Sequence, residues 1–137
     1  MLTEKDYCDY DTCVALKELG YKVPTSAYYM PNNNQLIFVS NPFRGGYVID
    51  CFYSHNSLPK DVMTANYIDA PTMWEAQKWL REQRLLFIEI NKILYGGYKF
   101  HVVDLTTYTE ESCGYTDGYE EALLEGIKEA VKILATC

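Results

Sequence analysis

Three side chains in the C-terminal half of the chain carry the groups that a nucleophilic site needs. His101 offers a base, Asp104 an acid and Cys113 a thiol, and a cysteine nucleophile works beside a histidine that an acid orients. On a strand, however, His101 and Asp104 point to opposite faces unless a bulge intervenes. The glycine pairs at 45–46 and 96–97 also lack the spacing of a phosphate-binding loop. We therefore predict no catalytic residue and no bound cofactor.

The thiols and imidazoles do not form a zinc motif. A zinc site uses about four such ligands, and two of them are usually separated by two to four residues. Cys8 and Cys13 lie five positions apart and Cys51 and His55 lie four apart, with no second pair of defined spacing. We expect Cys8, Cys13 and Cys51 to act as small buried hydrophobic side chains and His55 to be an incidental loop residue, and we predict no metal site.

Asp6, Asp9 and Asp11 form an acidic cluster near the N-terminus that could suggest calcium or magnesium. A calcium-binding EF-hand loop beginning at Asp9 would need glycine at its sixth position and glutamate at its twelfth, where Val14 and Gly20 stand. That motif is excluded. Carboxylates at the start of a helix compensate its dipole, and we predict this role for the cluster.

Residues 72–83 predict an amphipathic helix at the centre of the chain. Thr72 and Glu75 have the spacing of a reciprocal capping pair, and Pro71 cannot extend a helix backwards, so the helix is expected to start at Thr72. A period of about 100° per residue places apolar side chains on one face. That predicted inner face consists of Met73, Ala76, Trp79 and Leu80.

Two further helices are predicted, one near each end of the chain. The first covers residues 9–19, with Asp9 as its N-cap and Gly20 in the left-handed position just beyond its end. The last covers residues 118 to about 134, with Asp117 as its capping residue. Its apolar arc is broad, and we expect it to be the main core helix.

Gly126 lies in the middle of that apolar arc. A glycine inside a helix costs up to about 1 kcal/mol relative to alanine. We therefore predict that a neighbouring backbone or ring packs closely against Gly126.

Two runs rich in β-forming residues, 25–30 and 35–40, flank an asparagine-rich turn and predict a first hairpin. A loop over residues 41–46 and a third strand over residues 47–53 are expected to follow. Residues 55–66 have no clean period and predict an irregular surface segment.

A second hairpin is predicted from residues 85–91 and 98–105, with Gly96 and Gly97 supplying the positive φ angles of its turn. The polar residues 106–115 are expected to form a loop. A period of two predicts the inward-facing side chains of the hairpin, which are Leu86, Ile88, Ile90, Phe100 and Val102.

The predicted order is α-β-β-(β)-α-β-β-α. Hairpins imply antiparallel pairing, and no strand-helix-strand alternation indicates a parallel sheet. The fold class is therefore α+β, with three helices packed on antiparallel β-hairpins. A length of 137 residues is typical of one domain, which we expect to span 1–137.

The net charge and the cysteine content limit which classes of partner and which cellular compartment we expect. A net charge of −7 opposes binding to nucleic acid, and no apolar run is long enough to cross a membrane. The polar start lacks the features of a secretory signal. Five cysteines, an odd number, favour reduced thiols. We expect a cytoplasmic protein that binds neither nucleic acid nor membrane.

Several motifs are distinctive. They are residues 15–21 (ALKELGY), residues 70–72 (APT) leading into 79–82 (WLRE), and residues 119–122 (YEEA). In this combination the chain resembles a group of small uncharacterised proteins encoded by gut anaerobic bacteria, often in phage or mobile-element regions. The resemblance spans most of the chain, loses definition over residues 43–66, and implies an origin rather than an activity.

The content of 13 tyrosines and two tryptophans favours either β-sheet surfaces or interfaces. Trp74 points about 100° away from the apolar face of its helix. It is either covered by neighbouring side chains or exposed as an interface anchor.

We therefore expect a non-enzymatic protein-interaction module that binds either a protein partner or itself, and self-association would give a homodimer. The candidate contact residues are Trp74, Tyr28 and Tyr53. Two alternatives stay open. One is a small enzyme or small-ligand binder built from residues distant in sequence, such as His101 and the N-terminal aspartates. The other is an acidic mimic of nucleic acid.

Overall fold

The structure is a computed structural model that describes residues 2–23, 25–30, 34–38 and 68–136. Within these ranges it confirms the α+β class. The elements in chain order are η1 (Glu4–Asp6), α1 (Tyr10–Glu18), β1 (Ala27–Tyr29), β2 (Leu36–Phe38), β3 (Ile68–Asp69), α4 (Met73–Gln83), β4 (Leu86–Lys92), β5 (Tyr98–Asp104), β6 (Thr109–Thr116) and α5 (Tyr119–Ala135).

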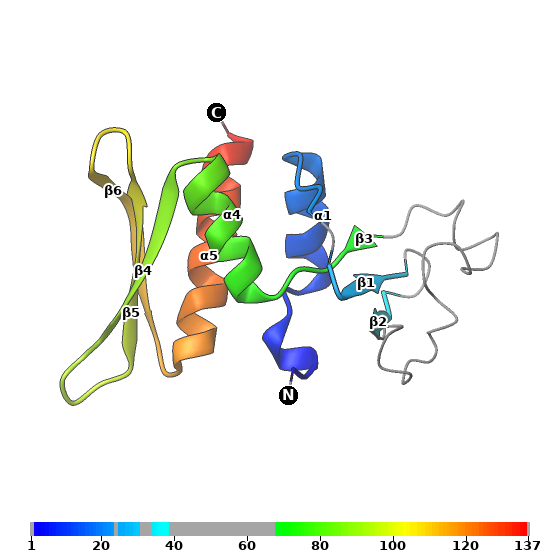
Figure 1. Ribbon diagram of the computed structural model, residues 1–137. Helices are drawn as coiled ribbons and strands as arrows, with labels where there is room; N and C mark the ends of the chain where they lie inside the picture. Colours follow the sequence, from blue (N-terminus) through cyan, green and yellow to red (C-terminus); the bar gives the residue numbers. More distant parts are fainter. Residues whose placement is uncertain (1, 24, 31–33, 39–67, 137) are drawn as a thin grey trace.

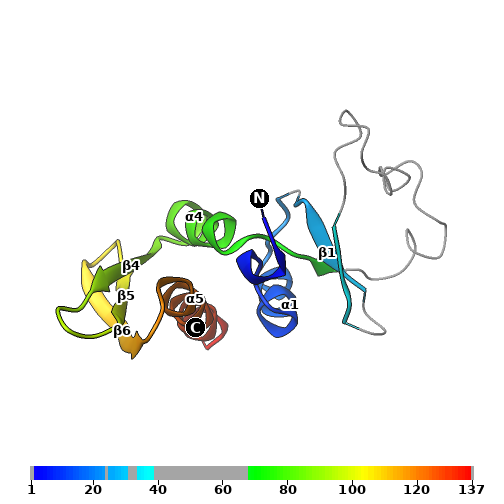
Figure 2. The same cartoon turned by 90° about the horizontal axis from the view of Figure 1, so that it is seen from below.

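Helices α4 and α5 pack on one face of the antiparallel sheet β4-β5-β6 (Figures 1 and 2). Helix α1 lies on the side of α5 that faces away from this sheet, and the small sheet β2-β1-β3 lies beyond α1 (Figure 2). Helix α5 contacts all three strands of the larger sheet as well as α1 and α4. It is therefore the element around which the described layers assemble.

The predicted starts of α1 and α4 are confirmed. The Thr72 hydroxyl accepts from the Glu75 amide at 3.2 Å, and the Glu75 carboxylate accepts from the Thr72 amide at 2.8 Å. Asp9 accepts from the Thr12 amide at 3.0 Å, and Gly20 has the expected left-handed φ of 101°. Local capping chemistry thus determines where both helices begin.

The predicted cap of α5 is wrong by one residue. The N-cap is Gly118 rather than Asp117, and no side chain bonds to it as a cap. Strand β6 keeps the chain extended through Thr116, whose hydroxyl donates to the Gly118 carbonyl at 2.7 Å. The helix therefore begins one residue later than the capping pattern indicates.

The second hairpin and its inward side chains are confirmed. Ile88 pairs with Val102 and Ile90 with Phe100 in the register of β4 and β5. Ile88, Val102 and Phe100 are buried, as is Leu86, while Ile90 is half-buried. The period of two was sufficient to predict the inward-facing side chains because one face of both strands packs on helices.

The predicted loop over residues 106–115 is wrong, because most of it forms strand β6, paired with β5. Two inward-facing positions of β6 are Ser112 and Gly114. The Ser112 hydroxyl donates to the Glu129 carboxylate of α5 at 3.0 Å, and Gly114 lies against the Phe100 ring. Neither residue is apolar enough to give an alternating pattern. A register shift between Val102 and Val103 interrupts the period further.

The predicted turn geometry of this hairpin is also wrong. Neither Gly96 nor Gly97 has a positive φ, and Tyr95 instead adopts a φ of 64°. Gly97 allows the turn to lie close to the backbone of β6, because a Cβ there would lie 2.1 Å from the Thr116 carbonyl oxygen.

The first hairpin is confirmed, since β1 pairs antiparallel with β2. The other edge of β1 pairs with β3, which the sequence did not predict. The strand expected over residues 47–53, the loop over 41–46 and the irregular segment over 55–66 lie outside the described residues.

The buried side chains form one cluster that includes residues from α1, α4, α5 and both sheets. Cys8 and Cys13 belong to it, as expected of small hydrophobic side chains. Over the ranges that the structure covers, no helix has the length and apolar character needed to cross a membrane.

The predicted close contact at Gly126 is confirmed. A Cβ at this position would lie 2.6 Å from Cγ2 of Ile88 and 3.5 Å from Cδ1 of Phe100. Both neighbours are buried side chains of the sheet. Helix α5 therefore lies directly on β4 and β5 because Gly126 has no side chain.

Replacing Gly126 by alanine tests this packing. An ordinary glycine in a helix would gain stability on this change, whereas here we expect the free energy of unfolding to fall by about 1–3 kcal/mol because the added methyl overlaps Ile88. Chemical denaturation measures the change. In an Ile88→Ala background the same substitution should be neutral or stabilising, and an equal loss in both backgrounds would contradict the account.

Candidate functional site

The structure brings together only part of the predicted group His101, Asp104 and Cys113. His101 pairs across the strands with Cys113, between the buried Phe100 and Val102, so the alternation places both side chains on the face of the sheet opposite the helices. Asp104 instead accepts from the amide and hydroxyl of Thr106 at 2.8 and 2.6 Å, which hold its pKa below the usual range. The acid beside His101 is Glu110.

Glu110 is the acidic partner of His101. Its carboxylate binds Nδ1 of His101, and this bond is the main reason that the pKa of Glu110 is lowered. Among the described residues, no hydrogen bond joins the Cys113 thiol to the imidazole, and Cys113 is exposed on an open face. This is not the arrangement that activates a cysteine nucleophile.

The N-terminal aspartates act at helix starts. Asp6 accepts from the Thr3 amide at 2.7 Å in the capping box of η1. Burial raises the pKa of Asp9, but hydrogen bonds from Thr12 and the charge of Lys128, 3.2 Å away, outweigh it and lower the pKa below its usual value. Asp9 thereby links α1 to α5 on the side of α5 away from the sheet, and it does not join His101.

Among the described residues, no three cysteine, histidine or acidic side chains lie close enough to hold a metal ion. Cys51 and His55 lie outside those residues. The buried thiol of Cys13 donates to the Cys8 carbonyl, and its contact with Cys8, together with burial, raises its pKa. Such a thiol serves packing rather than chemistry.

The three predicted contact residues differ in position. Trp74 is 38% exposed on α4, one helical turn before Gln77, whose amide donates to the Ile88 carbonyl at 2.8 Å. Trp74 therefore lies on the side of α4 that faces β4. Tyr28 is only 5% exposed, and Tyr53 lies outside the described residues.

Aromatic side chains gather at one end of the larger sheet, where the β4–β5 turn meets the start of α5. We call this surface the tyrosine end. The Tyr98 and Tyr119 rings meet edge to face at 5.7 Å, and Lys92 lies 5.3 Å from the Tyr98 ring. The members of the tyrosine end are Leu94, Tyr95, Tyr98, Tyr115 and Tyr119. The sequence signal that could have revealed it is a turn that contains leucine and tyrosine in place of polar turn formers.

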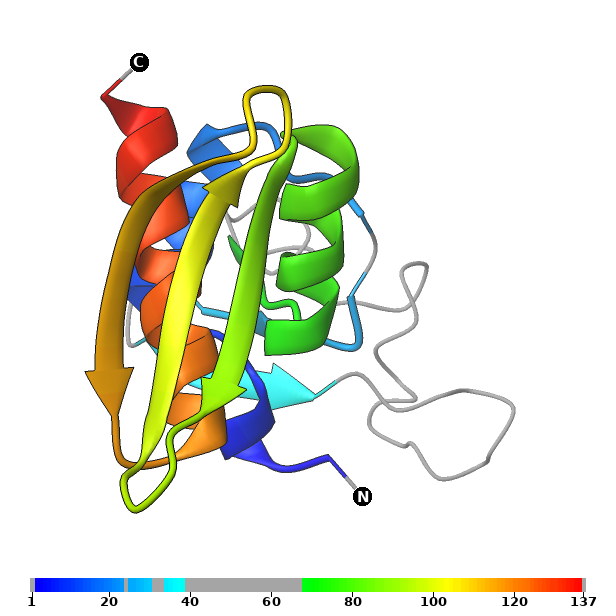
Figure 3. The ribbon, with the colours of Figure 1, turned by 90° about the vertical axis from the view of Figure 1, so that its left-hand side faces the viewer.

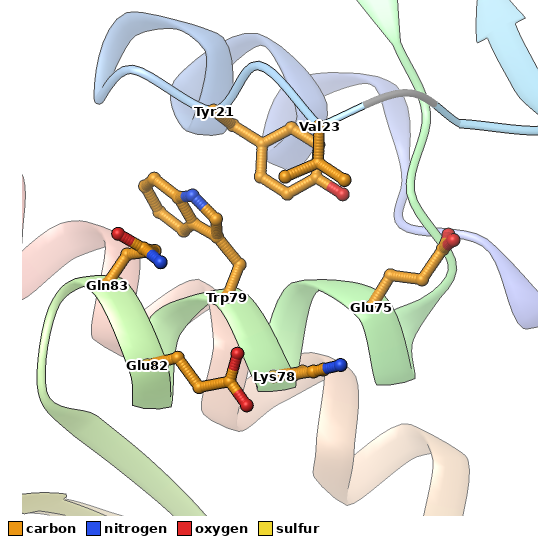
Figure 4. A pocket seen from close by; sticks show the side chains of 7 residues that line it. All are labelled: Tyr21, Val23, Glu75, Lys78, Trp79, Glu82 and Gln83. Carbon is orange, nitrogen blue, oxygen red and sulfur yellow. The ribbon is translucent and has the colours of Figure 1, made fainter.

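A separate pocket lies between α4 and the connection that follows α1 (Figure 4). Its volume is about 230 Å³. Tyr21 and Val23 form one wall. The other wall consists of Glu75, Lys78, Trp79, Glu82 and Gln83 from α4. Sequence reasoning missed this pocket, because its two walls lie far apart along the chain, at Tyr21 and Val23 and at Glu75 to Gln83, and because the period of α4 predicts Trp79 as an ordinary core residue.

The hydroxyl of Tyr21 is buried in this wall without a hydrogen-bond partner among the described residues. The Tyr21 side chain is 4% exposed, and its ring meets the Trp79 ring edge to face at 5.3 Å. Burial is the main cause of its raised pKa, followed by the charge of Glu75. A buried hydroxyl without a partner is costly, so its presence needs an explanation.

Comparison with known proteins gave no match to a family model, a curated protein or a solved structure. The resemblance to proteins of gut anaerobic bacteria therefore stays a prediction. Function has to be inferred from the side chains and their geometry.

The Tyr21 hydroxyl provides a stability test. We expect Tyr21→Phe to raise the free energy of unfolding by about 1 kcal/mol, because it removes a buried polar group without a partner. Tyr29→Phe is the matched control, since the Tyr29 hydroxyl donates to the Cys8 carbonyl at 2.8 Å and its loss should cost about 1 kcal/mol. Denaturant unfolding measures both. A loss of stability in Tyr21→Phe would show that its hydroxyl has a partner in the folded protein.

Proposed function

We propose that this protein acts by binding another protein chain, in the first instance a second copy of itself, through the tyrosine end. The observation that carries the proposal is the exposure of large apolar side chains at the β4–β5 turn. Leu94 is 78% exposed and Tyr95 is 98% exposed, and Tyr115 nearby is 69% exposed. Tyrosine clusters of this kind supply rigid contact area in protein interfaces.

The neighbours of Tyr95, rather than its backbone, distinguish this turn. Its φ of 64° lies in the left-handed region, as does the φ of 58° of Tyr108 at the other hairpin tip. Tyr95, however, lies beside the further aromatic side chains of the tyrosine end, including the Tyr98 and Tyr119 pair. A partner can therefore contact several rings at this turn.

Charged groups around the tyrosine end favour a second copy as the partner. Lys92 and Lys99 each lie 5.3 Å from a tyrosine ring, of Tyr98 and Tyr115 respectively. The start of α5 beside them carries exposed acidic side chains, namely Asp117, Glu120 and Glu121. In a two-fold dimer, the lysines of one copy can face the carboxylates of the other, so the surface is complementary to itself.

Trp74 extends the proposed surface along the edge of β4. Its exposure of 38% and its position beside β4 are consistent with a second anchor at an interface. We leave the buried Tyr28 out of this surface. Tyr53 stays a predicted contact residue.

We infer that this association takes place in the cytoplasm of the host. The described cysteines Cys8, Cys13 and Cys113 are free thiols, which fits a reducing compartment. The net charge of −7 supports a protein partner rather than nucleic acid. A phage or mobile-element origin, as the sequence resemblance implies, is part of the same proposal.

Tyr95→Asn tests the proposed interface. Asparagine tolerates a positive φ, so the turn should keep its shape while the ring is lost. We expect the variant to dissociate at concentrations where the wild type is dimeric, with the dimer dissociation constant raised about tenfold or more. Light scattering coupled to size-exclusion chromatography measures the mass.

Tyr108→Asn is the matched control. Tyr108 is also at a hairpin tip, has a φ of 58° and is 81% exposed, but it lies at the opposite end of the sheet. Its loss should leave association unchanged, whereas Trp74→Ala should weaken it. A wild type that stays monomeric at all concentrations, or equal effects of the two tyrosine substitutions, would refute the second-copy interface.

A further inference from the structure

We propose that the pocket between Tyr21 and Trp79 binds a cationic group that carries N–H donors, a guanidinium or a primary ammonium. This site is independent of the tyrosine end, because it lies on the face of α4 turned toward the connection after α1 (Figure 4). Three features of the pocket support a cation: the buried hydroxyl of Tyr21, the aromatic corner and the carboxylate of Glu75.

The Tyr21 hydroxyl is a buried polar group on a residue that lines the pocket. No described residue donates to it or accepts from it, and Val23 lies beside it (Figure 4). After burial, the group that raises the pKa of this hydroxyl most is the Glu75 carboxylate. A hydroxyl oxygen in such negative surroundings is suited to accept from a positively charged N–H group.

Glu75 can share this donor with Tyr21. One of its carboxylate oxygens accepts from the Thr72 amide as part of the α4 cap. A carboxylate has further acceptor sites on both oxygens, so the cap leaves Glu75 able to accept another hydrogen bond. A guanidinium, with several N–H groups in one plane, can reach two acceptors at once.

The aromatic corner favours the same chemistry. The Tyr21 and Trp79 rings meet at 65° with their centroids 5.3 Å apart. The Trp79 ring already has a guanidinium over it, because Cζ of Arg84 lies 5.9 Å from the ring centroid. Arg84 itself is held by the Leu19 carbonyl at 2.9 Å and is not part of the pocket wall. Cations bind to the faces of tryptophan and tyrosine rings.

Glu75 is the lining carboxylate available to a bound cation. Glu75 and Glu82 flank Lys78 along one stripe of α4, and Glu82 also lies 3.7 Å from Arg81, which is not part of the pocket wall. Lys78 is exposed and has no ion pair within 4 Å among the described residues, and its long side chain can turn outward. The volume of about 230 Å³ suits a side-chain head group rather than a larger metabolite.

The test uses tryptophan fluorescence. The chain has two tryptophans, so Trp74→Phe leaves Trp79 as the single reporter. At constant ionic strength, N-acetyl-arginine amide should change the Trp79 emission saturably. N-acetyl-citrulline amide, its neutral counterpart of nearly the same shape, should bind at least about tenfold more weakly. Tetramethylammonium, which has the charge but no N–H donor, should also bind more weakly than the arginine amide.

Three substitutions in the same background locate the site. Tyr21→Phe and Glu82→Gln should each weaken binding of the arginine amide several-fold, and Lys78→Gln should strengthen it. Glu89→Gln is the matched control, because Glu89 is an exposed carboxylate on β4, away from the pocket. Equal binding of the arginine and citrulline amides, no saturable signal, or affinity unchanged in Tyr21→Phe would overturn the proposal. Because Tyr21→Phe is expected to stabilise the fold, weaker binding by this variant could not be attributed to unfolding.

Discussion

Phe100 is packed between two glycines, and this contact sets the spacing of the whole α/β unit. A Cβ on Gly114 of β6 would lie 2.6 Å from the Phe100 ring, and one on Gly126 of α5 would lie 3.5 Å from it. The same Gly126 position would overlap Ile88 of β4. Helix α5 therefore approaches the Ile88 and Phe100 side chains so closely that only a glycine fits at position 126. Since α5 also contacts α1 and α4, the rest of the described core depends on this contact between α5 and the sheet.

The two proposed binding surfaces follow from this arrangement. Helices α4 and α5 cover one face of the larger sheet and leave the other face and both hairpin tips uncovered (Figure 3). The β4–β5 turn is held against the end of β6 by the close approach of Gly97 to Thr116, which places the exposed Tyr95 near the start of α5. The opposite side of α4 meets the connection after α1 and forms the pocket. One helix thus separates an aromatic surface suited to a protein from a small, acidic pocket suited to a cation.

The sequence predicted what local rules determine. The capping pair of Thr72 and Glu75, the cap at Asp9 and the alternation of Leu86, Ile88 and Ile90 each depend on residues a few positions apart, and the structure confirms them. Strand β6 was not predicted because its inward positions hold Ser112 and Gly114. Ser112 bonds to α5 and Gly114 packs against Phe100, and neither contributes to an apolar period of two. The pocket and the His101–Glu110 contact escaped because tertiary packing alone brings their residues together. The tyrosine-rich composition favoured either sheet surfaces or an interface, and it did not show which tyrosines are exposed.

The central claim is that α5 and the larger sheet form a single cooperative unit through the contact at Gly126 and Phe100. Native-state hydrogen exchange tests it most directly. The account predicts that the most protected amides of α5 and of strands β4 and β5 exchange with one free energy, equal to that of global unfolding. If the amides of α5 around Gly126 exchanged through a lower-energy opening while β4 and β5 stayed protected, the helix would not be the element that holds the sheet, and the account would be wrong.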